Sequence, residues 1–183
     1  MVASYTLALG NKQCYNKRDK ILRREKMGIF NYYGLIIIVL ILLPNIAFAA
    51  LNKDGFKNAY ENKPLENCEQ IGRFGCFILM IVNVPYTYFG FWFDCALTAY
   101  LAVNGALTLV YMLGWVVLWK KPGVLRALLL SITPSAIFLF SGIMLANIPL
   151  GVFSVLFAIT HITLSYNNAA AEEKKQEKNK SSK

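Results

Sequence analysis

The chain has few charged residues and a single histidine. Of its 183 residues, 16% are charged and 56% are hydrophobic. A disordered chain carries more charge and an ordinary soluble domain is less apolar, so this composition argues against both. One histidine and four cysteines are also too few for the usual structural zinc site. We therefore expect no metal and no other cofactor.

Familiar catalytic motifs are missing as well. The sequence contains no G-x-x-x-x-G-K-[ST], no H-E-x-x-H and no G-x-S-x-G. After Met27, the only acidic residue outside the polar loops and tail is Asp94, at a turn between apolar runs. No set of serine, histidine and acid can therefore meet within the apolar part. We expect a protein that is not an enzyme.

Long apolar runs are what the sequence does contain. About 20 residues in a helix cross a hydrocarbon core of about 30 Å, and lipid offers no partner to backbone polar groups, so such runs must be helical. A chain of 183 residues has too little polar surface to bury five such helices in a soluble fold. The prediction is an all-α polytopic membrane protein, a bundle of five transmembrane helices. The expected spans are residues 29–51, 74–93, 95–119, 124–146 and 148–166.

The two ends of the chain differ from this membrane domain of residues 27–166. Residues 1–26 are basic, and Arg23-Arg24-Glu25-Lys26 can be encoded by AGG-AGA-GAA-AAA, a purine-rich stretch typical of a bacterial ribosome-binding site. One hypothesis is that Met27 is the true start and the leader is not native. The alternative is a genuine basic arm. Residues 167–183 are expected to form a polar, disordered tail.

The net charge of +9 is distributed in a way that indicates orientation. After Met27, the basic residues are concentrated in three segments: four in residues 52–73, three around Lys120 and five in the tail. With five spans, all three segments would lie on the same side of the membrane. The positive-inside rule places that side in the cytoplasm. We expect the bacterial cytoplasmic membrane, with the chain N-out and C-in. Ala47-Phe48-Ala49 also fits a signal-peptidase site, but cleavage there would place those basic residues outside, so an uncleaved span is favoured.

Polar residues within the apolar runs are the candidate functional groups. Counting residues from the predicted turns places several of them near the same depth, and His161 would point toward Ser135 or Thr133. Ionisable groups inside a membrane commonly mark ligand or proton sites, whereas a purely structural role would be hydrogen bonding between helices. The candidate intramembrane polar layer consists of Asn45, Asn83, Asn104, Ser135 and His161.

Four short segments also carry a resemblance. They are Leu43-Pro44-Asn45-Ile46, Glu69-Gln70-Ile71-Gly72-Arg73, Pro85–Phe93 and Ile159-Thr160-His161-Ile162-Thr163. Together they resemble small uncharacterised polytopic membrane proteins of low-GC Gram-positive bacteria. The resemblance extends from Met27 to about Asn168 and implies a bacterial source. It implies no catalytic residue.

Two functions agree with this sequence. In the first, the polar layer binds or passes a small solute or a proton. In the second, the chain is a non-enzymatic accessory or scaffold subunit of a membrane complex, and the polar layer only holds the helices together. The expected partners are the lipid bilayer and either another membrane protein or a second copy of the chain. Nucleic acid is not expected, because the basic residues are dispersed at helix ends.

Overall fold

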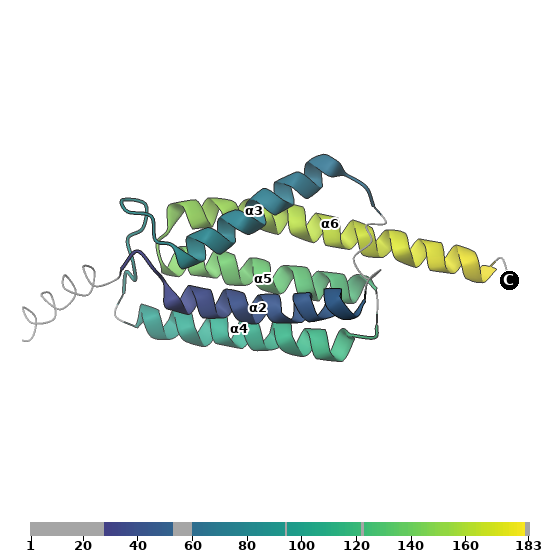
Figure 1. Cartoon of the computed structure of the whole chain (residues 1–183), viewed down its shortest axis with the longest axis horizontal. Coiled ribbons are helices and arrows are strands. Elements are labelled where there is room, and N and C mark those ends of the chain that lie inside the picture. The colour runs from purple at the N-terminus through teal and green to yellow at the C-terminus, as the bar shows by residue number, and fades with distance from the viewer. Residues whose placement is uncertain (1–27, 53–59, 94, 122, 182–183) are drawn as a thin grey trace, which may run out of the picture.

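The computed structural model of the chain describes residues 28–52, 60–93, 95–121 and 123–181. Successive helices in this part run in opposite directions and form an up-and-down bundle (Figure 1). The all-helical class predicted from the sequence is confirmed. The described helices are α2 (Tyr32–Leu51), α3 (Lys63–Ile81), α4 (Ala96–Leu118), α5 (Val124–Met144) and α6 (Ile148–Ser181).

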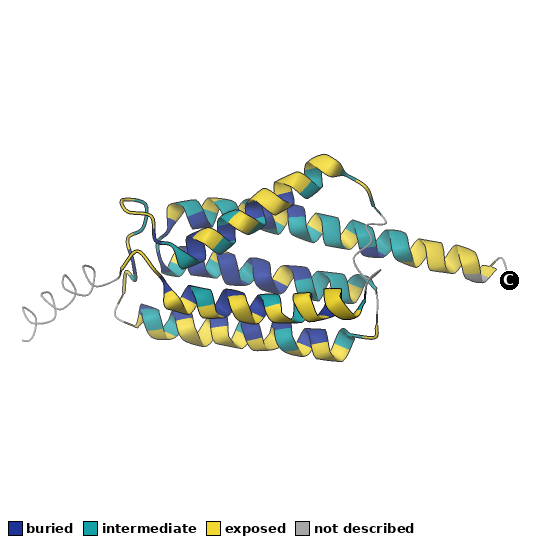
Figure 2. Cartoon of the chain, viewed as in Figure 1, coloured by how far each residue is buried: buried dark blue, intermediate teal, exposed yellow. Residues whose placement is uncertain are grey.

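Four of these helices, α2, α4, α5 and α6, are long and apolar enough to cross a membrane. Their outward faces are apolar as well as exposed (Figure 2). Val116, Leu109 and Val152, for example, are 74%, 65% and 64% exposed. An exposed surface of this kind suits contact with lipid rather than with water. These four helices mark the chain as a membrane protein.

Only residues 74–81 of the second expected span, 74–93, are helical, and the helical prediction is wrong for residues 82–93. Helix α3 begins earlier, where the Asn62 side chain accepts a hydrogen bond from the backbone N–H of Leu65 (3.2 Å) and Pro64 occupies the first turn. It ends at Ile81. Pro85 disfavours helical backbone at the residue before it, and Tyr86 and Gly90 then adopt positive φ of 67° and 76°. The apolar character of residues 82–93 therefore belongs to an irregular segment.

The C-terminal part of α6 departs from the expected disordered tail. The helix continues without interruption to Ser181, because alanine, glutamate, lysine and glutamine in this stretch are strong helix formers. Two contacts hold the extension. The backbone N–H of Val124 donates to Glu173 Oε1 (3.0 Å), and the N–H of Tyr60 donates to Asn168 Oδ1 (2.8 Å). The predicted leader, residues 1–26, and Met27 lie outside the described residues.

The helix ends gather at two opposite faces of the bundle. We call one the neutral end, consisting of residues 28–31, 82–93 and 145–147, which are joined by the bridges Phe30↔Val82 and Tyr88↔Asn147. The basic end is where α2 and α4 finish and α3 and α5 begin; it carries Lys120 and Lys121. Helix α3 is oblique to the others at this end (Figure 1).

Glycines allow α3, α5 and α6 to approach closely. A Cβ placed on Gly72 of α3 would lie 3.0 Å from the Cα of Phe157 on α6. A Cβ on Gly142 of α5 would lie 3.0 Å from the backbone nitrogen of Gly151 on α6. Small residues serve this purpose in membrane bundles, where packing rather than the hydrophobic effect drives helix association. Helix α6 is therefore fixed tightly between α3 and α5.

We expect Gly72→Ala to lower the thermal unfolding midpoint of the detergent-solubilised protein. The added methyl group would press against the Phe157 backbone, and such overpacking destabilises by about 1–3 kcal/mol. Gly105→Ala is the matched control, because its Cβ meets nothing within 4 Å and alanine favours helix. It should leave the midpoint unchanged or raise it. Equal midpoints for the two variants would contradict the close α3–α6 contact.

Candidate functional site: a cavity at the basic end

A cavity of about 690 Å³ lies inside the basic half of the bundle. Its volume is within the range of small-molecule sites. All five described helices contribute to it: the C-terminal halves of α2 and α4, the N-terminal halves of α3 and α5, and the middle of α6. The charged residues that line the cavity are Glu66, Glu69, Arg73, Arg126 and Glu172, with His161 as its titratable imidazole.

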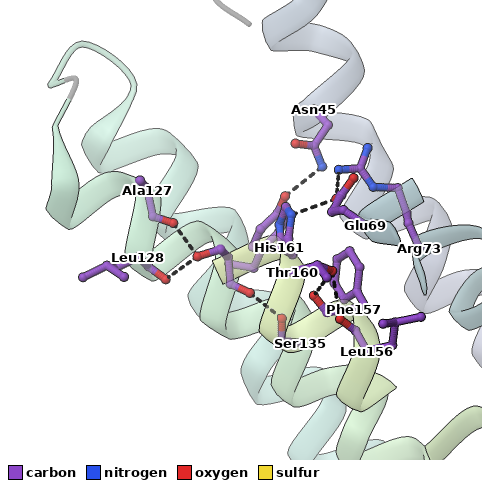
Figure 3. A network of polar contacts seen from close by, with 12 residues as sticks. Asn45, Glu69, Arg73, Ala127, Leu128, Ser135, Leu156, Phe157, Thr160 and His161 are labelled. Atoms are coloured by element: carbon purple, nitrogen blue, oxygen red, sulfur yellow. Dashed lines mark hydrogen bonds and ion pairs between the residues drawn. The ribbon is translucent and has the colours of Figure 1, made fainter. Parts of the chain in front are cut away.

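The most buried of these charged groups is the carboxylate of Glu69. Its side chain is 1% exposed. Its Oε1 accepts a hydrogen bond from Nδ1 of His161 at 2.9 Å and another from the guanidinium of Arg73, one turn further along α3. Figure 3 shows the three side chains turned toward one another from α3 and α6. A buried charge needs such partners, because an unpaired carboxylate removed from water is strongly unfavourable.

The imidazole of His161 is held in one orientation. Its ring stacks on the Phe157 ring, with centroids 4.5 Å apart and an interplanar angle of 17°. The contact with Glu69 assigns a proton to Nδ1, so in the neutral ring Nε2 is a hydrogen-bond acceptor. Both Glu69 and His161 line the cavity.

Asn45 contributes a polar group from α2. Its side-chain nitrogen donates to the Ile41 carbonyl (2.9 Å) and to the Tyr111 hydroxyl on α4 (2.7 Å). The bond to Ile41 satisfies a backbone carbonyl in the turn that contains Pro44. The bond to Tyr111 joins α2 to α4 at the cavity wall. Asn45 therefore both links α2 to α4 by a hydrogen bond and lines the cavity.

The structure does not bring the five predicted polar residues into one layer. Asn45 and His161 meet at the basic-end cavity. Ser135 is buried and donates to the Ser131 carbonyl of its own helix (2.7 Å), as Thr133 does to the carbonyl of Leu129. The partner of His161 is therefore Glu69 rather than Ser135 or Thr133.

The two remaining asparagines lie away from the cavity. Asn104 is fully buried and donates to the Ser141 hydroxyl at 3.1 Å, which connects α4 to α5. Asn83 lies at the neutral end, where its side chain donates to the Gly28 carbonyl (3.2 Å). The sequence-based depth of Asn83 assumed a helix through residues 74–93. Because α3 ends at Ile81, Asn83 lies at the bundle end instead.

Sequence reasoning missed Glu69 and Arg73 as site residues. Both belong to the charged segment 52–73, where Pro64 predicts a short interfacial helix leading into the second span, but neither was assigned to a site. Two signals could have identified them: the helix start at Asn62-Lys63-Pro64 and the four-residue spacing of an acid and a base, which pairs side chains on one helix face.

Comparison of the chain with protein-family models, with curated proteins and with solved structures found no match. The site must therefore be interpreted from its own chemistry. In the part of the chain that the structure describes, no three His, Cys, Asp or Glu residues lie close enough to hold a metal ion. What the cavity offers is a buried ion pair, an imidazole and an aromatic lining.

We expect Glu69 and His161 to show energetic coupling in a double-mutant cycle. Glu69→Gln and His161→Gln should each lower the free energy of unfolding by about 1–3 kcal/mol, because a glutamine at either position weakens the hydrogen bond between the pair and, at position 69, removes the negative charge that faces Arg73. The double variant should lose less than the sum, with a coupling energy of about 0.5–3 kcal/mol. The measurement is reversible unfolding in mixed micelles.

The control cycle pairs Glu69→Gln with Ser135→Ala. Ser135 bonds only to its own helix in the described structure, so these two effects should add. Additivity in the Glu69–His161 cycle as well would refute a direct interaction between the two side chains.

Proposed function

We propose that the chain is a multi-pass protein of the bacterial cytoplasmic membrane that binds a small solute in its basic-end cavity. The observation that carries this proposal is the combination of a cavity of about 690 Å³ with a buried Glu69–His161–Arg73 cluster in its wall. Ionisable groups kept within a membrane bundle usually serve binding or proton transfer. The Glu69–His161 pair supplies a proton-exchanging group beside the bound solute.

The proposed topology has all five described helices in the bilayer, N-out and C-in. Helix α3 enters with its apolar part from Phe74 to Ile81, and its charged first turns lie toward the cytoplasm. The distribution of charge supports this orientation: residues 28–31, 82–93 and 145–147 of the neutral end contain no lysine or arginine. Lys120, Lys121 and the lysines of the α6 extension all belong to the basic end.

Two native cysteines allow the orientation to be tested. Cys95 and Cys68 are both exposed, and they lie at the neutral end and the basic end of the bundle respectively. In a Cys14→Ser background, a membrane-impermeant maleimide should label Cys95 in intact cells and should label Cys68 only after permeabilisation. The Cys95→Ser and Cys68→Ser variants identify each band on a gel. Labelling of Cys68 alone in intact cells would show the inverse orientation.

Solute binding can be tested by filling the cavity. Ala127 lines the cavity, so Ala127→Phe should occupy its volume while the helices stay in place. Native mass spectrometry of protein released directly from membrane vesicles should show a bound small molecule on the wild type and none on this variant.

Ala106→Phe is the matched control, because Ala106 is exposed on the outer face of α4. It should retain the bound molecule. A wild-type protein that is always released without a small molecule, or equal occupancy of the wild type and Ala127→Phe, would overturn the proposed function.

A further inference from the structure

One wall of the cavity carries a guanidinium that forms no ion pair with any residue in the described part of the chain. Arg126, on the first turn of α5, lines the cavity and is half-buried. Its Nη1 makes a long hydrogen bond to the Trp119 carbonyl (3.4 Å), and its Cζ lies 5.2 Å from the centre of the Phe48 ring. A guanidinium has five N–H donors, so most of these remain available.

Two further hydrogen-bond donors, both on α4, line the cavity beside Arg126. Trp115 is 4% exposed, and its indole Nε1 makes no hydrogen bond within 3.5 Å in the described structure, although it lies near enough to the Tyr111 hydroxyl to interact with it. The Tyr111 hydroxyl accepts its hydrogen bond from Asn45, which leaves its own proton to donate. The centre of the Phe48 ring lies 5.0 Å from that of the Trp115 ring, and the Arg126 guanidinium lies over the same Phe48 ring. We call Tyr111, Trp115 and Arg126 the donor wall.

None of the three acidic residues that line the cavity, Glu66, Glu69 and Glu172, forms an ion pair with Arg126. Glu69 is engaged by Arg73 and His161 on the α3 and α6 side. Glu172 acts on Arg126 through its charge but makes no ion pair with it. A buried indole N–H and an unpaired guanidinium are both donor-only groups, and leaving them unsatisfied is unfavourable. An acceptor that carries negative charge would satisfy both.

The interior of the cavity is apolar and aromatic. Phe77 and Phe138 meet edge to face with ring centres 5.8 Å apart, and Phe138 meets Phe157 at 5.4 Å. All three line the cavity. Such a surface suits a hydrocarbon or ring portion of a ligand, since burial of apolar area drives binding. The cavity thus pairs an anion-binding wall with an apolar interior.

The geometry points to an amphipathic anion as the solute of this cavity, with its carboxylate or phosphate group on the donor wall and its apolar part against Phe77, Phe138 and Phe157. This assignment rests on the proposed solute-binding function and adds the chemical class of the solute. Arg126 is the residue that selects charge, and Trp115 and Tyr111 fix the position of the anionic group. Arginine suits this task because its planar fork matches both oxyanions.

The test uses four ten-carbon probes that differ in the head group: decanoate, decyl phosphate, decanamide and decylammonium. The protein is placed in nanodiscs of phosphatidylcholine in a Trp92→Phe background. Of the three tryptophans, only Trp115 and Trp119 beside the cavity then report by fluorescence. Decanoate and decyl phosphate should bind at least about tenfold more tightly than decanamide, since a charge-assisted hydrogen bond is worth about 1.5–3 kcal/mol and each 1.4 kcal/mol is a factor of ten.

Matched variants assign the effect to the donor wall. Arg126→Gln should weaken the binding of both anions to the level of decanamide and leave decanamide unchanged. Lys121→Gln removes an exposed charge from the same end without touching the cavity and should change nothing. Trp115→Phe, which retains the packing and removes the N–H, should weaken anion binding severalfold. Trp115→Phe provides the same test of the donor wall if circular dichroism shows that Arg126→Gln does not fold.

The outcomes separate this assignment from the proposed function. If decanamide or decylammonium binds as tightly as the anions, and Ala127→Phe abolishes that binding, the cavity binds solutes but the anion assignment is overturned. If Lys121→Gln weakens the anions as much as Arg126→Gln does, the donor wall is refuted. If no probe binds and native mass spectrometry finds no bound molecule, both proposals fail.

A last arm identifies the source of the anion. Nanodiscs with added phosphatidylglycerol should weaken decanoate binding to the wild type if the wall takes a lipid phosphate. Unchanged binding indicates an anion that arrives from the aqueous phase. Either result can be interpreted in this way only after Arg126→Gln has been shown to abolish the preference for anions.

Discussion

The burial of one carboxylate governs the arrangement of this bundle. Glu69 is almost completely removed from solvent, and a carboxylate in such a place needs a cation and hydrogen-bond donors to remain ionised. Its two partners come from different helices: Arg73 lies one turn along α3, and His161 lies on α6. The interaction therefore fixes the register of α3 against α6. The close approach at Gly72 makes it possible, because any larger side chain there would separate the two helices.

Hydropathy alone predicted four of the five described helices closely, since a long charge-free run in lipid has no alternative to helix. It failed for α3, where apolarity and helical structure occupy different residues. Residues 82–93 are apolar enough to extend a span, but Pro85 and the positive φ of Tyr86 and Gly90 exclude a helix. For residues 63–73 the sequence predicted only a short interfacial helix starting at Pro64, whereas the Asn62 cap and Pro64 start one helix that continues to Ile81. The limits of α3 were therefore set by local signals, the Asn62 cap at its start and Pro85 beyond its end, rather than by composition.

The site was predictable only in part for the same reason. His161 and Asn45 were identified as intramembrane polar groups, and they do meet at one cavity. Their depth could be counted from the ends of helices whose limits were nearly correct. The depth of Asn83 could not, because its helix ends before it. The partners that give His161 its chemistry, Glu69 and Arg73, became visible only when α3 was placed against α6. No sequence pattern reveals that the guanidinium of Arg126 forms no ion pair within the residues the structure describes.

The length of α6 has a structural consequence. Its 34 residues span about 51 Å at 1.5 Å per residue, well beyond the roughly 30 Å of a hydrocarbon core. The residues beyond that length continue the same helix that carries His161. Through Glu173 it also holds the first backbone N–H of α5, two residues before Arg126. The extension thus connects the helix that carries His161 to the start of the helix that carries Arg126.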